Sequence, residues 1–128
     1  MRLLLDTHTF LWTVENSDRL SERARAAIAD GGNEKLLSIA SLWEIAIKVS
    51  LGKLAIAGPF DEMVDRLVAN RLITLLPITP AHLKRVATLP HHHGDPFDRL
   101  IIAQAQEGGL TVVGNDPAFD AYGVTRLW

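Results

Sequence analysis

Short apolar runs alternate with longer helical segments along this chain, and this alternation constrains its fold more than any other feature. Residues 3–5, 36–39, 73–76, 110–113 and 124–127 are predicted strands. Helices are predicted at residues 7–15, 21–31, 42–51, 59–70, 80–89 and 96–107, with a helical turn at 117–121. Strands that alternate with helices form a parallel sheet covered on both faces. We therefore expect an α/β fold, a three-layer α/β/α sandwich with a central parallel sheet.

Helix ends and chain length support one compact unit. Ser41 is the predicted N-cap of the third helix, with Gly52 at its C-terminal end. The 128 residues contain no internal repeat and no linker long enough to separate two domains. We therefore predict a single domain over residues 1–128.

The composition excludes several kinds of chemistry. The chain has no cysteine, so disulfides, thiolate metal sites and cysteine nucleophiles are excluded. Asp6 interrupts the first apolar run too early for a signal peptide or a membrane span, and we expect a cytoplasmic protein without membrane contact. The net charge of −2 argues against a broad basic nucleic-acid surface. Any contact with RNA should therefore be local, or be assisted by a metal or a second subunit.

Acidic residues from four chain segments are predicted to meet at one edge of the sheet. Asp6 follows the first strand and Asp116 the fourth, and ligands of such sheets bind beyond the carboxyl ends of the strands. Glu44 lies one turn beyond Ser41, while Asp95 and Asp98 begin a later helix. Converging carboxylates repel one another unless a cation joins them. A hard divalent ion, Mg²⁺ or Mn²⁺, prefers such oxygen ligands and would activate water for attack on a phosphodiester.

Each of these residues also has a purely structural interpretation. Asp6, Asp95 and Asp116 stand at predicted helix starts, where an aspartate caps free N–H groups. Glu44 lies among apolar residues and could pair with Lys48 one turn later. Taken singly, capping is the better interpretation for the three aspartates, so spacing alone supports a metal site only weakly.

Other polar and aromatic residues receive simpler assignments. Asp98 could form a solvated pair with Arg99. Residues 91–93, three consecutive histidines, are interpreted as a solvated loop near the mouth of the site, because neighbours in a loop cannot all face one ion. Lys48 and Arg99 could instead contact the phosphates of a substrate. Trp12 and Trp43 are expected in the core or on a dimer face, with base stacking as the less favoured interpretation.

Several short motifs occur in order along the whole chain. They are RLLLDTH from residue 2, SIASLWEIAIK from residue 38, LGKL from residue 51, LPIT from residue 76, HGDPFDRLIIAQA from residue 93 and NDPAF from residue 115. This ordered set, which is far more specific than any one motif, resembles the PIN-domain family and its VapC-type toxins.

The resemblance implies a set of site residues. Asp95 would lie next to the metal ligands without binding the metal itself, and Thr7 would orient a metal-bound water. The chain departs from the family pattern at Gly114, where a threonine or serine is common, so a hydroxyl near the site is absent. The implied metal-binding acids are Asp6, Glu44, Asp98 and Asp116.

The resemblance also implies an activity and partners. It implies a metal-dependent endoribonuclease that uses Mg²⁺ or Mn²⁺ to hydrolyse RNA, acts as a toxin, pairs with a small antitoxin protein and forms a homodimer. A non-catalytic module that binds nucleic acid or antitoxin is the alternative, favoured slightly by Gly114 and the acidic pI. A phosphatase-like enzyme on the same kind of sheet is a third interpretation, which assays with simple phosphomonoesters would separate.

Overall fold

A central sheet of five parallel strands organises the protein, which a computed structural model describes over residues 1–128. The strand order is β3-β2-β1-β4-β5, so β1 lies in the middle. Each neighbouring pair is parallel, as the intervening helices require. The strands are β1 (Arg2–Leu5), β2 (Glu34–Ser38), β3 (Thr74–Leu76), β4 (Thr111–Val113) and β5 (Arg126–Leu127).

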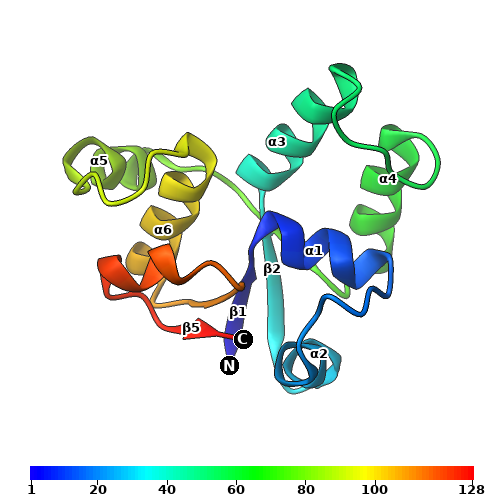
Figure 1. The fold of residues 1–128 in the computed structure, drawn as a ribbon, viewed down its shortest axis with the longest axis horizontal. Coiled ribbons are helices and arrows are strands. Elements are labelled where there is room, and N and C mark those ends of the chain that lie inside the picture. Colours follow the sequence, from blue (N-terminus) through cyan, green and yellow to red (C-terminus); the bar gives the residue numbers. More distant parts are fainter.

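Helices cover both faces of the sheet (Figure 1). Leu3 and Leu5 point into one apolar core with α1 to α4, whereas Leu4 points into a second core with α6 and η1, because side chains alternate along a strand. This arrangement confirms the predicted three-layer sandwich. No helix is long and apolar enough to cross a membrane. The helices are α1 (Thr7–Val14), α2 (Glu22–Ala29), α3 (Ile39–Ser50), α4 (Phe60–Asn70), α5 (Pro80–Thr88), α6 (Pro96–Gly108) and the 3₁₀ helix η1 (Pro117–Tyr122).

Several predicted boundaries were wrong: β2 spans Glu34–Ser38 and not residues 36–39, and two further differences concern α3 and the last strand. The helix α3 begins at Ile39 and not after Ser41, because the Ser38 side chain accepts a hydrogen bond from the Ala40 N–H and caps the helix. Ser41 is therefore a buried residue inside the first turn. The last strand is also shorter than predicted, since only Arg126–Leu127 pairs with β4.

The order of the strands places a crevice at the centre of the sheet. From β1 the chain proceeds outward to β2 and then β3, whereas β4 and β5 lie on the other side of β1. The connections leaving the carboxyl ends of β1 and β4 therefore diverge to opposite faces. Such a switch point is where ligands bind in open α/β sheets. Asp6 follows β1 directly, and residues 114–116 follow β4.

Candidate active site

Asp6 lies at the centre of the switch point and is almost fully buried, at 5% exposure. Its Oδ1 accepts a hydrogen bond of 2.7 Å from the Thr7 N–H, so it caps α1 as the structural interpretation predicted. Its backbone N–H donates to the carbonyl of Val113, which fixes it against β4. The Asp6 Oδ2 accepts no hydrogen bond from the protein. A capping role and a free carboxylate oxygen therefore coexist in one residue.

One side of the site, the α3 wall, consists of Ser41, Glu44 and Lys48. Glu44 is buried, and its Oε2 accepts a hydrogen bond of 2.7 Å from the Lys48 ammonium. Its Oε1 accepts a hydrogen bond of 2.8 Å from the Thr7 hydroxyl, which lies 2.9 Å from the Ser41 Oγ. The predicted Glu44–Lys48 pair is confirmed. The Glu44 carboxylate is thus charge-balanced and held at both oxygens.

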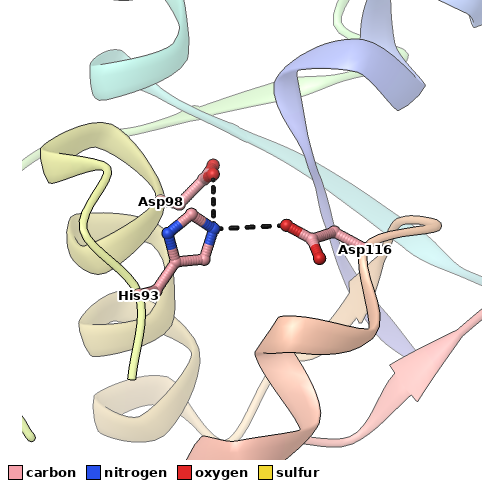
Figure 2. A group of neighbouring side chains, drawn as sticks. All are labelled: His93, Asp98 and Asp116. Carbon is pink, nitrogen blue, oxygen red and sulfur yellow. Dashed lines mark hydrogen bonds and ion pairs between the residues drawn. The ribbon is translucent and has the colours of Figure 1, made fainter. Parts of the chain in front are cut away.

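The opposite side, the α6 wall, consists of His93, Asp98 and Asp116 (Figure 2). The His93 Nε2 lies 3.0 Å from the Asp98 Oδ2 and 3.2 Å from the Asp116 Oδ2. These three side chains offer ligand atoms within 4.8 Å of one another, the spacing of a metal-binding group. The histidine comes from the loop before α6, Asp98 from its first turn and Asp116 from the segment after β4. Three separate segments therefore converge here.

Asp95 and Asp116 also cap helices, as the sequence predicted. The Asp95 Oδ1 accepts hydrogen bonds from the Phe97 and Asp98 N–H groups at 2.8 and 3.2 Å, which fixes the start of α6. The Asp116 Oδ1 accepts from the Ala118 N–H at 2.9 Å at the start of η1. By fixing the first turn of α6, Asp95 positions the Asp98 side chain.

Burial and crowding of like charges make the centre of the site unfavourable for negative charge. Burial raises the pKa of Asp98 to about 7, and the charges of Asp6 and Asp95 act in the same direction. Burial also raises the pKa of Asp6, to which the charges of Glu44 and Asp116 contribute. On the α3 wall the hydrogen bond to Glu44 raises the pKa of Lys48, so this residue stays a cation.

The residues present fit a hard divalent cation. The Asp6 Oδ2 and the Asp98 Oδ1 accept no hydrogen bond from the protein, although both carboxyls are largely buried among other acids. Carboxylate oxygens of this kind are the ligands that Mg²⁺ and Mn²⁺ prefer. A cation between them would relieve the repulsion that raises both pKa values.

Gly114 lies against Asp6. A Cβ atom at this position would lie 3.1 Å from the Asp6 Cβ and 3.3 Å from its Oδ2, closer than ordinary van der Waals contact. The missing side chain therefore gives the Asp6 carboxylate its space. Position 114 therefore offers no hydroxyl to the site, and the backbone after β4 lies close to the Asp6 side chain.

Arg99 does not pair with Asp98 as the solvated-pair interpretation had it. Its side chain is buried, and its two terminal nitrogens donate to main-chain carbonyls of the loop before α6, including those of Pro90 at 2.8 Å and Leu89 at 3.0 Å. The guanidinium thus anchors the loop that carries His93 and is directed away from solvent. Of the two cations expected to contact phosphate, only Lys48 borders the acids with a partly exposed side chain.

The two tryptophans of interest differ in exposure. Trp12 packs against the apolar core of α1 to α4 and against Trp128, with ring centroids 5.8 Å apart. Trp43 is 58% exposed and makes an edge-to-face contact with Phe97 at 5.1 Å. It therefore lies on the surface beside the site and not in the core.

His93 is the site residue that sequence reasoning missed. It was interpreted as part of a solvated loop, whereas its side chain is only 16% exposed and contacts two acids. His91 and His92 are exposed, as predicted. The one sequence signal for this role is that His93 lies two residues before Asp95, the predicted N-cap of a helix. This position places His93 at the start of α6.

Sequence comparisons identify relatives across nearly the whole chain. The profile of the PIN domain matches residues 3–124. Ribonuclease VapC22 of Mycobacterium tuberculosis (strain ATCC 25618 / H37Rv) is 31% identical over 115 residues, covering 89% of this chain and 86% of that protein.

Solved structures share the fold at lower identity. DNA-bound VapBC of Salmonella typhimurium superposes with a TM-score of 0.71 and 19% identity, covering 98% of this chain and 96% of the other. FitAcB of Neisseria gonorrhoeae superposes with a TM-score of 0.64 and 22% identity, covering 97% and 95%. The family profile spans Asp6 and the acids of both walls, and the VapC22 relative covers most of the chain. The chain therefore belongs to the PIN-domain family.

Proposed function

We propose that this protein is an endoribonuclease that depends on Mg²⁺ or Mn²⁺ and acts as the toxin of a toxin–antitoxin pair. The observation that carries the proposal is the meeting of Asp6, Asp98 and Asp116 at the switch point of the sheet, with burial raising the pKa of the first two. The ribonuclease name of the VapC22 relative supports RNA as the substrate. The function rests on the acidic centre, since no other catalytic motif is present.

The residues would divide the work between them. Asp6, Glu44, Asp98 and Asp116 would hold the cation, which when bound supplies Lewis acidity and activates water for hydrolysis. Thr7 donates its hydroxyl proton to the Glu44 carboxylate, and its hydroxyl oxygen would still be able to orient a metal-bound water, as predicted. Lys48 has a partly exposed ammonium beside the acids and would attract the phosphate backbone of RNA.

Cleavage of a structured RNA by the purified protein tests the proposal. The assay is run with Mn²⁺, with Mg²⁺ and with EDTA, on the wild type and on Asp6→Asn, with Asp61→Asn as the control because Asp61 is an exposed aspartate of α4. We expect metal-dependent cleavage that Asp6→Asn abolishes and Asp61→Asn retains. Binding of RNA without cleavage under every condition would favour the non-catalytic module instead.

An apolar groove supports a protein partner. It lies between α1 and α4, has a volume of about 420 Å³ and is lined mainly by hydrophobic side chains, among them Leu11, Val14, Met63 and Leu72. Such a groove accepts the apolar face of an amphipathic helix. We propose the antitoxin as its occupant because the structural neighbours include VapBC complexes.

A calorimetric titration with the antitoxin tests this groove. Leu72→Glu should weaken antitoxin binding, and unchanged affinity would show that the groove is not part of the interface.

A homodimer is supported by the exposed face of α3. Trp43 is 58% exposed and Ile39, one turn earlier, is 37% exposed. Apolar side chains of this size at one surface are typical of interfaces. The molar mass in solution should be that of a dimer for the wild type and fall toward a monomer for Trp43→Glu. A wild type with the mass of a monomer would contradict the proposal.

A further inference from the structure

Two contacts orient the His93 ring, and a third anchors its backbone. Its Nδ1 accepts a hydrogen bond of 3.2 Å from the Asp95 N–H, and its ring meets Phe119 edge to face at 6.0 Å. Its backbone N–H donates to the Tyr122 hydroxyl at 2.7 Å, and that hydroxyl donates in turn to the carbonyl of Pro90. The backbone is therefore anchored, and only rotation of the side chain could move the ring.

The contact with Asp95 indicates which ring nitrogen carries the proton. A neutral imidazole has one N–H and one lone pair. The lone pair is at Nδ1, because that atom accepts from the Asp95 N–H. The proton is therefore on Nε2, the atom that lies 3.0 Å from Asp98 and 3.2 Å from Asp116. His93 faces the acids as a hydrogen-bond donor.

While Nδ1 accepts from the Asp95 N–H, the Nε2 of His93 carries the proton and has no lone pair to offer a metal, although its position is that of a ligand atom. Histidine binds a metal through a ring nitrogen with a lone pair, and its other nitrogen usually donates a hydrogen bond. His93 has the reverse arrangement. Its Nε2 lies 3.2 Å from Asp116 Oδ2, to which it is hydrogen-bonded, and 3.0 Å from Asp98 Oδ2, so the ring lies against two of the acids that would hold a cation (Figure 2).

We propose that His93 is a positioning residue that partners Asp98 and Asp116 in place of the cation in the metal-free protein, and that metal binding displaces its imidazole. The inference rests on the proposed function only for the metal. Its Nε2 hydrogen-bonds Asp116 and lies 3.0 Å from Asp98, and these two acids come from the segment after β4 and from α6 and would otherwise repel each other. His93 thus keeps the α6 wall assembled without metal and competes with the metal when it arrives.

Metal affinity without RNA tests the competition. Mn²⁺ is titrated calorimetrically into metal-free wild type, His93→Ala and the control His91→Ala, since His91 is an exposed histidine of the same loop. Removal of one competing hydrogen-bond donor should raise the affinity of His93→Ala about fivefold, while His91→Ala matches the wild type. His93→Ala should also lower the midpoint of thermal unfolding of the metal-free protein by about 4 °C. Unchanged or weaker Mn²⁺ binding by His93→Ala would overturn the inference.

Imidazole ¹⁵N spectra of the wild type test the tautomer and need no variant to fold. We expect the Nε2–H form of His93 without metal and a change in its ring signals on addition of Mg²⁺. An Nδ1–H form without metal, or ring signals that Mg²⁺ at saturation leaves unchanged, would contradict the inference. If neither the wild type nor His93→Ala binds metal, the proposed cofactor and the displacement both fail, whereas binding by the wild type without the expected change in His93→Ala overturns the displacement alone.

Discussion

The two walls of the site hold their acids in different ways. On the α3 wall a single carboxylate, Glu44, is bound by the Lys48 ammonium and by the Thr7 hydroxyl, so that its charge is matched within the protein. On the α6 wall two carboxylates, Asp98 and Asp116, have one imidazole between them: its Nε2 hydrogen-bonds Asp116 at 3.2 Å and lies 3.0 Å from Asp98. The second wall therefore carries more negative charge than its partners compensate.

This difference indicates where the proposed cation would bind most favourably. The α3 wall is complete without metal and serves as a fixed support. The α6 wall and Asp6 crowd charge at the switch point, and burial with neighbouring acids raises the pKa of Asp98 to about 7. A divalent ion would therefore gain most of its binding energy from Asp6 and Asp98, with Glu44 as a weaker contributor.

The largest expected effect is on catalysis and compares the walls directly. Asp98→Asn should reduce RNA cleavage at least about 100-fold, because an essential ligand contributes several kcal/mol to the transition state. Glu44→Gln, which keeps the shape of the side chain beside Lys48, should reduce it less. Rates of RNA cleavage at saturating Mn²⁺, measured for the wild type and both variants, give the loss of activity in each variant. A greater loss in Glu44→Gln would reverse the assignment of the two walls.

Arg99 tests whether the α6 wall depends on the loop that carries His93. Arg99→Met leaves main-chain carbonyls of Pro90 and Leu89 without their buried donor and should lower the free energy of unfolding by about 3 kcal/mol. Arg85→Met, which removes an exposed pair with Glu107, should cost less than about 1 kcal/mol. Urea unfolding measures both. Equal effects would mean that the buried guanidinium contributes no more than a surface pair.

The pH dependence of stability tests the charge on the α6 wall. The pKa of Asp98 rises from 3.8 to about 7 on folding, so between these values the folded state binds more protons than the unfolded state. The free energy of unfolding of the metal-free protein should therefore fall as the pH rises through this window. After allowance for partial exposure, Asp98 should contribute about 2 kcal/mol of this fall.

The comparison with Asp98→Asn isolates that contribution. The variant cannot ionise at this position, so it should gain stability over the wild type near pH 8 and lose the advantage near pH 5. Denaturant unfolding at both values, in EDTA, provides the measurement. A difference between wild type and variant that does not depend on pH would show that Asp98 ionises without cost.

The smallest effect is expected on the α3 wall. Lys48→Met removes the ammonium from buried Glu44 and should lower the free energy of unfolding by about 1 kcal/mol, because the lysine side chain is 40% exposed and water partly replaces it. Adding Glu44→Gln should restore most of that stability, while Lys53→Met serves as an exposed control. A double variant no more stable than Lys48→Met would show that the pair is not coupled.

Much of the fold follows from local sequence signals. The run Leu3–Leu4–Leu5 is buried on both faces of a central strand, and such runs identify parallel strands without knowledge of the rest. The strand-end rule then brought Asp6 and Asp116 to one edge. The start of α3 was misplaced because Ser38 and Ser41 are equally good caps by sequence, and only the tertiary contact of Ser41 with Thr7 distinguishes them.

The rest of the site depends on contacts that no periodicity encodes. His93 and Arg99 lie in or beside one loop, and the sequence predicts both as polar surface residues. In the fold Arg99 is buried beneath that loop and His93 turns inward to the acids. These positions depend on the path of the chain between α5 and α6, which cap and strand signals do not specify.

Equilibrium binding of Mn²⁺ to the metal-free protein tests the central claim most directly. Binding is measured from the loss of the electron paramagnetic resonance signal of the free ion, for the wild type and for Asp6→Asn, Asp98→Asn and Glu44→Gln. The account predicts one site in the wild type, severe loss of affinity in Asp6→Asn and Asp98→Asn, and a smaller loss in Glu44→Gln. Wild-type affinity in Asp6→Asn and Asp98→Asn would contradict the claim that these two acids create the demand for a cation.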